Sequence, residues 1–232
     1  MNKTLAYYEQ NAKKYIAETV DLDMSEARSR VSIFLPYNGR ILDLGCGSGR
    51  DSLAFKKQKY NVLSVDGSPE MAGLATRYTE KFVLCQTFNK LKFPPEMFDL
   101  IWANASLLHL RWRDLPAFMI RSCVWIKPGS YYFVSFKYGD FEGERDGRYY
   151  TDLNEKKLNK LIKKVKILRI LDSWTSWGGR QDARTKWLNA ILKKTDLEQE
   201  QEAKEEQNRL CWEKLNKEIE EKFKKTHAQS QG

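Results

Sequence analysis

The chain has 232 residues and a formal net charge of +9, and its 41% hydrophobic and 12% aromatic content suits one α/β domain with a small appendage. No run approaches the ~20 apolar residues of a membrane span, and the polar N-terminal segment does not resemble a signal peptide, so we expect a cytoplasmic protein without a membrane partner. The four cysteines are far apart and form no C-x-x-C pair, so the pattern predicts neither a metal site nor a disulfide framework.

The positive charge is unevenly distributed along the chain. Ten acidic and seven basic residues follow position 194, which leaves a balance of +12 on the preceding residues. Such a basic body can attract nucleic acid, an anionic substrate or an acidic protein. The alternative is a lysine-rich surface that only faces solvent.

Alternating strand and helix patterns follow a helical N-terminal segment. Residues 1–35 form the expected helical cap, with aromatic and aliphatic side chains at helical spacing between Leu5 and Val20. Short apolar runs then predict strands at 41–44, 62–65, 82–85, 98–103, 131–136, 167–174 and 187–192. Other segments predict helices at 52–58, 69–78, 115–126 and 155–164, and a polar loop at 137–152.

This alternation predicts a Rossmann-like α/β fold over residues 36–194. Right-handed crossovers would give a doubly wound, mostly parallel seven-stranded sheet with helices on both faces. The segment 195–232 has no strand pattern, and we expect it to form a charged C-terminal helix.

The strongest motif is ILDLGCGSGRDS, at residues 41–52. The expected strand runs into Gly45, Gly47 and Gly49 before a helix begins, and glycines permit a tight turn and a close approach of ligand to backbone. The helix N-terminus adds N–H donors and a positive dipole end. The G-x-G-x-G spacing differs from the G-x-G-x-x-G of dinucleotide enzymes and favours a methionine-bearing cofactor. The alternative is an ordinary strand-to-helix turn.

Asp66 ends the second expected strand, seventeen residues after Gly49. A carboxylate at that place can accept both hydroxyl groups of a ribose in a bidentate hydrogen bond. Taken alone, such an aspartate could also be a helix N-cap. Its register with the glycine turn makes it a candidate for holding the cofactor.

Seven segments together carry a family resemblance: YYEQNAKKY, ILDLGCGSGRDS, VDGSPEM, FDLIWANASLLHL, KPGSYYFVSFKYG, ERDGRYYTD and KWLNAIL. Over about residues 7–192 the chain resembles class I S-adenosylmethionine-dependent methyltransferases and, within them, the branch related to tellurite-resistance methyltransferases. The resemblance implies S-adenosylmethionine as the cofactor. The cofactor-binding residues that it implies are Tyr7, Tyr15, Asp43, Gly45, Cys46, Gly47, Gly49, Asp66, Gly67, Ser68, Met71, Thr87, Phe88, Ala103, Ser106 and Leu107.

Two of these implied contacts have alternatives. Many family members carry an acidic residue where this chain has Thr87, and Gln86 or Thr87 could replace its bond to the adenine amino group. Tyr7 and Tyr15 would cover the cofactor from the N-terminal helix, or they would only pack an amphipathic helix.

Two groups of residues are candidates for the substrate side. His109 follows the fourth expected strand, at the edge where substrates enter such sheets, and is our candidate for a general base or for orienting the substrate. It could also be a structural histidine bonded to a loop. The second group follows the fifth expected strand, and the related branch has a similar pattern: Lys137, Tyr138, Arg145, Arg148 and Tyr149.

Because Arg binds carboxylates and phosphates in bidentate fashion, this second group favours an anionic small substrate. The alternative is that Arg145 pairs with Glu142 or Glu144 at the surface. A third group would wall the pocket or stack on a planar substrate, or would pack in the core near the last strands. Its members are Trp174, Trp177, Arg180, Arg184 and Trp187.

These patterns predict methyl transfer to a small molecule by in-line displacement, with the cofactor supplying the reactive group. A tRNA or DNA methyltransferase is the alternative that the basic body favours. Against it, ANAS stands where [DN]-P-P-[FYW] is expected for methylation of base amino groups, and no Pro-Cys pair for attack on cytosine occurs. A further alternative is a cofactor-binding module that contacts a protein partner through its C-terminal helix.

Overall fold

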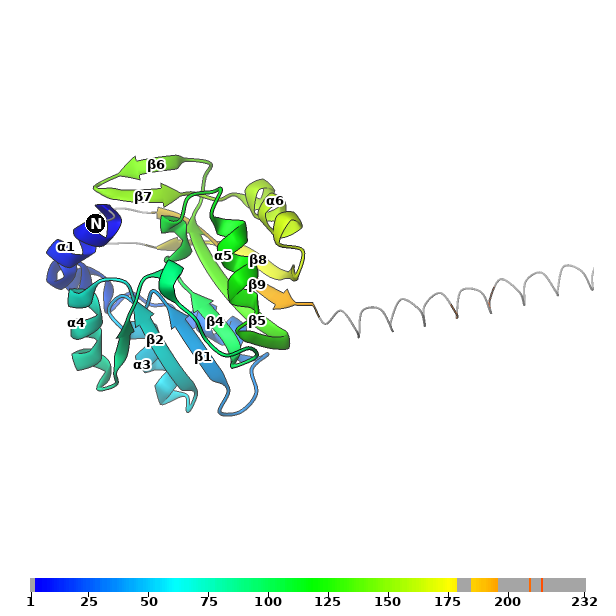
Figure 1. Ribbon diagram of the computed structural model, residues 1–232, viewed down its shortest axis with the longest axis horizontal. Helices are drawn as coiled ribbons and strands as arrows, with labels where there is room; N and C mark the ends of the chain where they lie inside the picture. Colours follow the sequence, from blue (N-terminus) through cyan, green and yellow to red (C-terminus); the bar gives the residue numbers. More distant parts are fainter. Residues whose placement is uncertain (1–2, 179–184, 196–208, 210–213, 215–232) are drawn as a thin grey trace, which may run out of the picture. The chain divides into compact units, whose positions relative to one another are not determined.

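One sheet organises the residues that the computed structural model describes, which are 3–178, 185–195, 209 and 214. In this part of the chain its seven strands are β1 (Arg40–Leu44), β2 (Asn61–Asp66), β3 (Val83–Cys85), β4 (Phe98–Ala103), β5 (Ile126–Lys137), β8 (Leu168–Gly178) and β9 (Thr185–Lys194). They lie in the order β3-β2-β1-β4-β5-β9-β8, and within this sheet β9 runs antiparallel to both of its neighbours (Figure 1). The other neighbouring pairs are parallel, which confirms the predicted Rossmann-like fold.

Helices cover both faces of this sheet. Those in the described part of the chain are α1 (Lys3–Thr19), α2 (Ser25–Ser32), α3 (Arg50–Lys57), α4 (Pro69–Thr79), α5 (Leu115–Cys123) and α6 (Glu155–Val165). Two short 3₁₀ turns, η1 (Phe88–Lys90) and η2 (Leu107–His109), follow β3 and β4. Strand β4 is buried along its whole length because it lies in the middle of these layers.

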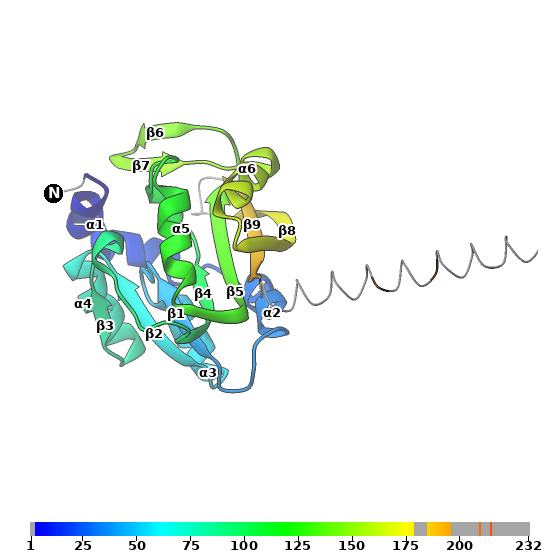
Figure 2. The same cartoon turned by 45° about the vertical axis from the view of Figure 1, so that its right-hand side comes forward.

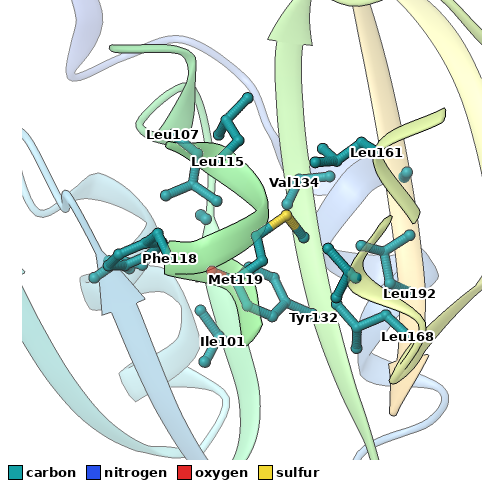
Figure 3. Packing of buried hydrophobic residues seen from close by; sticks show 14 of the residues in the cluster. Ile101, Leu107, Leu115, Phe118, Met119, Tyr132, Val134, Leu161, Leu168 and Leu192 are labelled. Carbon is teal, nitrogen blue, oxygen red and sulfur yellow. The ribbon is translucent and has the colours of Figure 1, made fainter. Parts of the chain in front are cut away.

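Two apolar cores lie on opposite faces of the sheet. In the larger one, α5 contributes Met119, β5 contributes Tyr132 and α6 contributes Leu161 (Figure 3). The other core packs α2 and α3 against the sheet, and there Trp102 stacks on Phe133 with ring centroids 4.0 Å apart. Because successive strand residues point to opposite faces, neighbouring residues of β5 belong to different cores.

The last two strands form an antiparallel hairpin, and both are longer than the segments predicted for them. The register places Trp187 of β9 between Lys137 of β5 and Ser176 of β8. Cross-strand partners point to the same face of a sheet, so these three side chains are neighbours near the carboxyl end of β5. The next row on that face consists of Ser135, Asn189 and Trp174.

A two-stranded sheet occupies part of the segment that the sequence predicts as a polar loop. Its strands β6 (Glu142–Arg145) and β7 (Arg148–Thr151) are joined by Asp146 and Gly147, whose φ angles are 52° and 74°. Two positive φ angles define the type I′ turn that Asp-Gly favours, so this hairpin had a signal in the sequence. Figures 1 and 2 show the hairpin and α1 beyond the carboxyl ends of the central strands.

The chain divides into two compact units, Met1–Lys194 and Thr195–Gly232. In the second unit the structure describes Thr195, Arg209 and Lys214, of which the last two are helical, so the predicted tail helix otherwise lies outside the described residues. The predicted division into cap, domain and tail stays a prediction. Among the helices of the described residues, none is long and apolar enough to cross a membrane.

Candidate cofactor and substrate site

A cavity of about 920 Å³ opens at the carboxyl ends of the parallel strands. Ligands bind at this edge in open α/β sheets, and the volume is near the upper end of the about 300–1,000 Å³ typical of ligand pockets. Its wall comes from the turn after β1, the end of β2, helix α1, η2, the β6–β7 hairpin and the β8–β9 end of the sheet. The cavity therefore has room for a cofactor together with a second small molecule.

Glycines shape the turn after β1. Gly45 and Gly47 have φ angles of 77° and 56°, in the left-handed region. A Cβ on Gly45 would lie 2.6 Å from the Cβ of Ser106, so the turn and the residue before η2 are in direct contact. A Cβ on Gly47 would instead lie 3.8 Å from Met71 and 3.9 Å from Tyr15, both of which line the cavity. The absence of a side chain at Gly47 thus keeps this part of the cavity open.

Asp66 presents its carboxylate to this turn from the end of β2. Its Oδ2 accepts a hydrogen bond from the Gly47 N–H at 3.0 Å, and its Oδ1 accepts one from the Ser68 N–H at 3.0 Å. Burial raises the pKa of Asp66 to about 6, and the N–H donors of Ser68, Gly47 and Gly67 oppose that rise. Each carboxylate oxygen can accept a further hydrogen bond, so Asp66 can bind a pair of hydroxyl groups.

Two of the other carboxylates that line the cavity, Asp43 and Asp51, are buried. Asp43 accepts a hydrogen bond from Ser52, and burial together with the charge of Asp51 raises the pKa of Asp43 to about 7. Burial alone would also raise the pKa of Asp51, but Arg50 and other donors lower it overall. The side chains that donate hydrogen bonds to Asp51 are Arg28, Arg50, Trp102 and Asn104. Among the described residues, no group of three or more His, Cys, Asp or Glu side chains is placed to hold a metal ion.

Helix α1 faces the cavity with Tyr8 and Tyr15, which are seven residues apart and share one helix face. Their rings meet edge to face, with centroids 5.1 Å apart. Tyr7, which the resemblance implied as a cofactor contact, lies outside the cavity lining and packs against Gly147 and Arg148. Because each helix position turns by about 100°, the neighbouring Tyr8 lines the cavity where Tyr7 does not.

His109 lines the cavity with both of its ring nitrogens engaged. Nδ1 lies 2.7 Å from the Tyr149 carbonyl oxygen, which can only accept, so Nδ1 carries a proton. In the neutral ring Nε2 is therefore an acceptor, and the Tyr8 hydroxyl donates to it at 2.8 Å. Burial lowers the pKa of His109 to about 4, and the charges of Arg148 and Lys137 act in the same direction. The imidazole is thus neutral at pH 7.

Lys137 and Arg148 bring positive charge to the cavity. Arg148 is 8% exposed, lies 4.3 Å from the Tyr7 ring centroid, and has a buried Nε without a hydrogen-bond partner. Lys137 Nζ lies 4.4 Å from the centroid of Tyr150. Within the described part of the chain, neither cation has a carboxylate oxygen within 4.0 Å, although Asp146 also lines the cavity. The two cations are therefore available to an anionic ligand.

The other three predicted substrate residues lie outside the cavity lining. Arg145 contacts both oxygens of Asp152, at 2.9 and 3.0 Å. Tyr149 points away from the cavity because alternate residues of β7 face opposite sides, and its hydroxyl donates to Glu142 at 2.7 Å. Tyr138 donates to a carboxylate of α6 at 2.9 Å. These three side chains therefore bond to neighbouring residues of the protein and do not line the cavity.

Most of the implied cofactor residues line the cavity: Tyr15, Asp43, Gly45, Cys46, Gly47, Asp66, Gly67, Met71, Thr87, Phe88 and Ser106. Besides Tyr7, those outside the lining are Gly49, Ser68, Ala103 and Leu107. Gly49 is the N-cap of α3, and Ser68 is the N-cap of α4 and donates to Glu9 of α1 at 2.7 Å. The other two are buried in the larger core. These four residues lie next to the residues that line the cavity and not in the lining itself.

The aromatic and basic group near the last strands lies only partly at the cavity. Trp174, Trp177 and Trp187 line it, and Trp177 is 70% exposed at its rim. Arg180 and Arg184 lie outside the described residues. The cross-strand register places Trp187 next to Lys137 and Trp174 in the following row, whereas Trp177 pairs with Lys186.

Sequence reasoning missed several residues that line the cavity: Tyr8, Asp51, Asn104, Ser135, Tyr150 and Asn189. Periodicity could have found Tyr8, Ser135 and Tyr150. They lie seven residues before Tyr15, two before Lys137 and two after Arg148, and so share a helix face or a strand face with these predicted residues. The others depend on which segments pack together, and the sequence gives no local signal for that.

Sequence comparisons relate part of this chain to methyltransferases. Residues 41–129 match a family model described as a methyltransferase domain. An uncharacterised methyltransferase of Schizosaccharomyces pombe is 31% identical over 140 residues, which cover 54% of this chain and 50% of the relative. A ubiquinone biosynthesis O-methyltransferase of Bradyrhizobium is 32% identical over 101 residues, which cover 41% of this chain and 39% of the relative. The chain therefore spans about half, or less, of the length of these relatives.

Solved structures share the fold. The 1,6-didemethyltoxoflavin-N1-methyltransferase of Burkholderia thailandensis, with bound 1,6-didemethyltoxoflavin and S-adenosylhomocysteine, has a TM-score of 0.64, 24% identity, and coverage of 82% of this chain and 85% of that chain. A methyltransferase of Methanosarcina mazei has a TM-score of 0.62, 18% identity, and coverage of 72% of this chain and 97% of that chain. The fold is that of class I S-adenosylmethionine-dependent methyltransferases, and residues 41–129 match the methyltransferase domain.

Proposed function

We propose that the protein is an S-adenosylmethionine-dependent methyltransferase that transfers a methyl group to a small anionic molecule. The observation that carries this proposal is the carboxylate of Asp66, which two N–H groups orient beside a glycine turn and which lines a large cavity. The similarity of residues 41–129 to a methyltransferase domain supports it. The tellurite-resistance-related branch and the cytoplasmic location stay predictions.

The residues present fit the proposed cofactor. Asp66 would accept the ribose hydroxyls, and the open position at Gly47 would let the ligand approach the backbone. The hydroxyl of Ser106 is buried at the cavity and has no protein hydrogen-bond partner, and buried polar groups of this kind need one. Met71 and Phe88 offer apolar contact to a flat base. When bound, S-adenosylmethionine would supply an activated methyl group.

Lys137 and Arg148 are suited to bind an acidic group of the acceptor. A buried guanidinium without a carboxylate partner destabilises the protein unless other groups compensate, and here aromatic rings do so in part. Burial and the charges of Arg145 and Arg148 lower the pKa of Lys137. A bound carboxylate or phosphate would offset this repulsion and occupy the unpartnered Nε of Arg148.

Calorimetry with S-adenosylhomocysteine tests the cofactor site. The variant Asp66→Asn removes a charged acceptor, and a hydrogen bond to a charged group contributes about 1.5–3 kcal/mol, so we expect affinity to fall by about 10-fold or more. The matched control is Asp99→Asn, which alters another buried carboxylate that lies outside the cavity lining and pairs with Lys127 at 2.6 Å. It should keep the wild-type affinity. Folded wild-type protein that binds no S-adenosylhomocysteine would refute the proposal.

A screen for S-adenosylhomocysteine production tests the substrate class. The protein is incubated with S-adenosylmethionine and separate pools of acidic metabolites, tRNA and DNA. Turnover with small acids supports the proposal. Turnover with tRNA or DNA alone would refute the small-molecule assignment and establish the nucleic-acid alternative. Binding of the cofactor without turnover of any pool would favour the interaction module.

A further inference from the structure

We propose that Tyr8 takes a proton from the methyl acceptor while passing its own proton to His109, and that the reacting group of the acceptor is therefore a hydroxyl or an amine. This inference rests on the proposed methyl transfer and goes beyond it, because it names the kind of atom that receives the methyl group. Tyr8 would be a catalytic residue, and His109 would act through it.

The direction of the Tyr8–His109 hydrogen bond carries the proposal. The carbonyl of Tyr149 fixes a proton on Nδ1 of His109, which leaves Nε2 of the neutral ring as an acceptor. The only proton of the Tyr8 hydroxyl therefore points to Nε2, 2.8 Å away. Toward the cavity, the Tyr8 oxygen can only accept hydrogen bonds. A protic group of a bound molecule can donate to it, whereas an acceptor without a proton cannot.

Tyr8 also lies between the two parts of the site. On one side its ring meets Tyr15, beside the glycine turn, with centroids 5.1 Å apart. On the other side the guanidinium of Arg148 lies 5.9 Å from its ring centroid. Burial raises the pKa of Tyr8 well above its usual value, while Arg148 opposes the rise. An acceptor held by Arg148 and extending toward the glycine turn would therefore pass along Tyr8.

The proton transfers balance the charge of the reaction. When bound, the sulfonium cofactor supplies the methyl group: its carbon–sulfur bond breaks with the electron pair going to sulfur, and a carbon–oxygen or carbon–nitrogen bond forms on the acceptor. The acceptor's proton moves to the oxygen of Tyr8, and the proton of Tyr8 moves to Nε2 of His109. Tyr8 ends as a neutral phenol, and His109 ends as an imidazolium carrying the positive charge that sulfur has lost.

We call these two proton transfers the relay. The surroundings of His109 explain why the relay needs a methyl acceptor that carries an anionic group. The groups that act on it are Tyr8 of α1, Lys137 of β5, and Arg148 and Tyr150 of β7. Tyr15 of α1 and Asp146 of the hairpin turn line the same cavity. Burial and the charges of the two cations lower the pKa of His109 and so disfavour an imidazolium. An anion bound to them offsets their charge and makes His109 a better proton acceptor. The methyl-accepting atom of a thiolate, of selenite or of tellurite is a sulfur, selenium or tellurium with a lone pair, which carries no proton for Tyr8 to remove.

The chain has only two histidines, His109 and His227, so the protonation of His109 can be observed directly by NMR with ¹⁵N-labelled histidine. A His227→Gln variant assigns the resonances. With S-adenosylhomocysteine bound at pH 7, we expect a proton on Nδ1 and none on Nε2. Tyr8→Phe should shift the Nε2 resonance, and Tyr7→Phe, which removes a neighbouring hydroxyl outside the cavity lining, should not. A proton on Nε2 would overturn the proposal, because Tyr8 would then be the acceptor.

Kinetics with matched acceptors give a second test. Para-hydroxybenzoate, para-aminobenzoate, para-mercaptobenzoate and selenite differ in the reacting group, and the first three share a carboxylate. We expect methylation of the hydroxyl or amino compound, with kcat falling by about 10²–10⁴-fold in Tyr8→Phe and in His109→Gln. Both variants should bind S-adenosylhomocysteine as the wild type does. In the wild type kcat should fall at low pH, where His109 is already protonated, and this fall should disappear in His109→Gln.

Preference for the thiol or selenite, or a wild-type kcat in Tyr8→Phe, would overturn the relay. This outcome is distinguishable from failure of the proposed function. If one of these results is obtained while the wild type binds S-adenosylhomocysteine, only the inference about Tyr8 is refuted. Absence of that binding in the wild type refutes the proposed function itself.

Discussion

Replacing Gly45 by alanine would test how tightly the glycine turn and η2 constrain each other. The φ angle of Gly45 is 77°, and an alanine in the left-handed region costs about 1–2 kcal/mol. The new Cβ would lie 2.6 Å from the Cβ of Ser106, and overpacking of this kind costs about 1–3 kcal/mol. We therefore expect the free energy of unfolding to fall by about 2–5 kcal/mol, measured by urea denaturation.

Two other glycines separate the contributions. Gly129 has a φ angle of 72°, but the nearest atom to its Cβ would be 4.0 Å away, so Gly129→Ala should lose only the backbone part of about 1–2 kcal/mol. At Gly67 a Cβ would lie 2.8 Å from the end of the Leu5 side chain, which can move, so Gly67→Ala should cost less than Gly45→Ala. Equal losses in Gly45→Ala and Gly129→Ala would show that the contact with Ser106 contributes nothing and would refute the reasoning.

Two further expectations concern the charged and titrating groups. Arg148→Met should raise the KM for anionic acceptors at least about 10-fold, because a charged hydrogen bond is lost. Its affinity for S-adenosylhomocysteine, measured by calorimetry, should stay at the wild-type value. An unchanged KM would contradict the role of Arg148. The pKa of His109 is about 4 in the folded protein against an ordinary 6.5, so the folded state binds fewer protons than the unfolded state between these pH values. The stability that His109 contributes is present above pH 6.5 and is lost as pH falls toward 4. Between pH 6.5 and pH 4 the free energy of unfolding of His109→Gln should therefore fall less than that of the wild type. Equal falls in the two proteins would contradict this.

Much of the fold could be predicted because buried parallel strands have continuous apolar sequences. Strand β4 lies where the sequence predicts it, at residues 98–103. Strand β5 is the instructive exception, because it begins at Ile126, five residues before the predicted start. Pro128 and Gly129 indicate the end of a helix, yet the strand passes through them, with a register shift against β4. An irregular strand of this kind has no periodic signal.

The candidate site divides in a similar way. Residues next to strand ends, such as Asp66 and Lys137, could be assigned from their positions alone. The pairing of Arg145 with Asp152 depends on the Asp-Gly hairpin, and the protonation of His109 depends on a backbone carbonyl forty residues away. Such arrangements are decided by tertiary packing and are not visible in local sequence patterns.

Helix α1 lines the cavity and is held in place at several points. Glu9 accepts hydrogen bonds from Ser68 and from the N–H of Glu70, the hydroxyl of Thr4 accepts from the N–H of Tyr149, and Tyr8 joins His109. A ligand would leave the cavity most readily when these links open together. In the proposed methyl transfer, release of the spent cofactor would therefore depend on how fast this seventeen-residue helix moves.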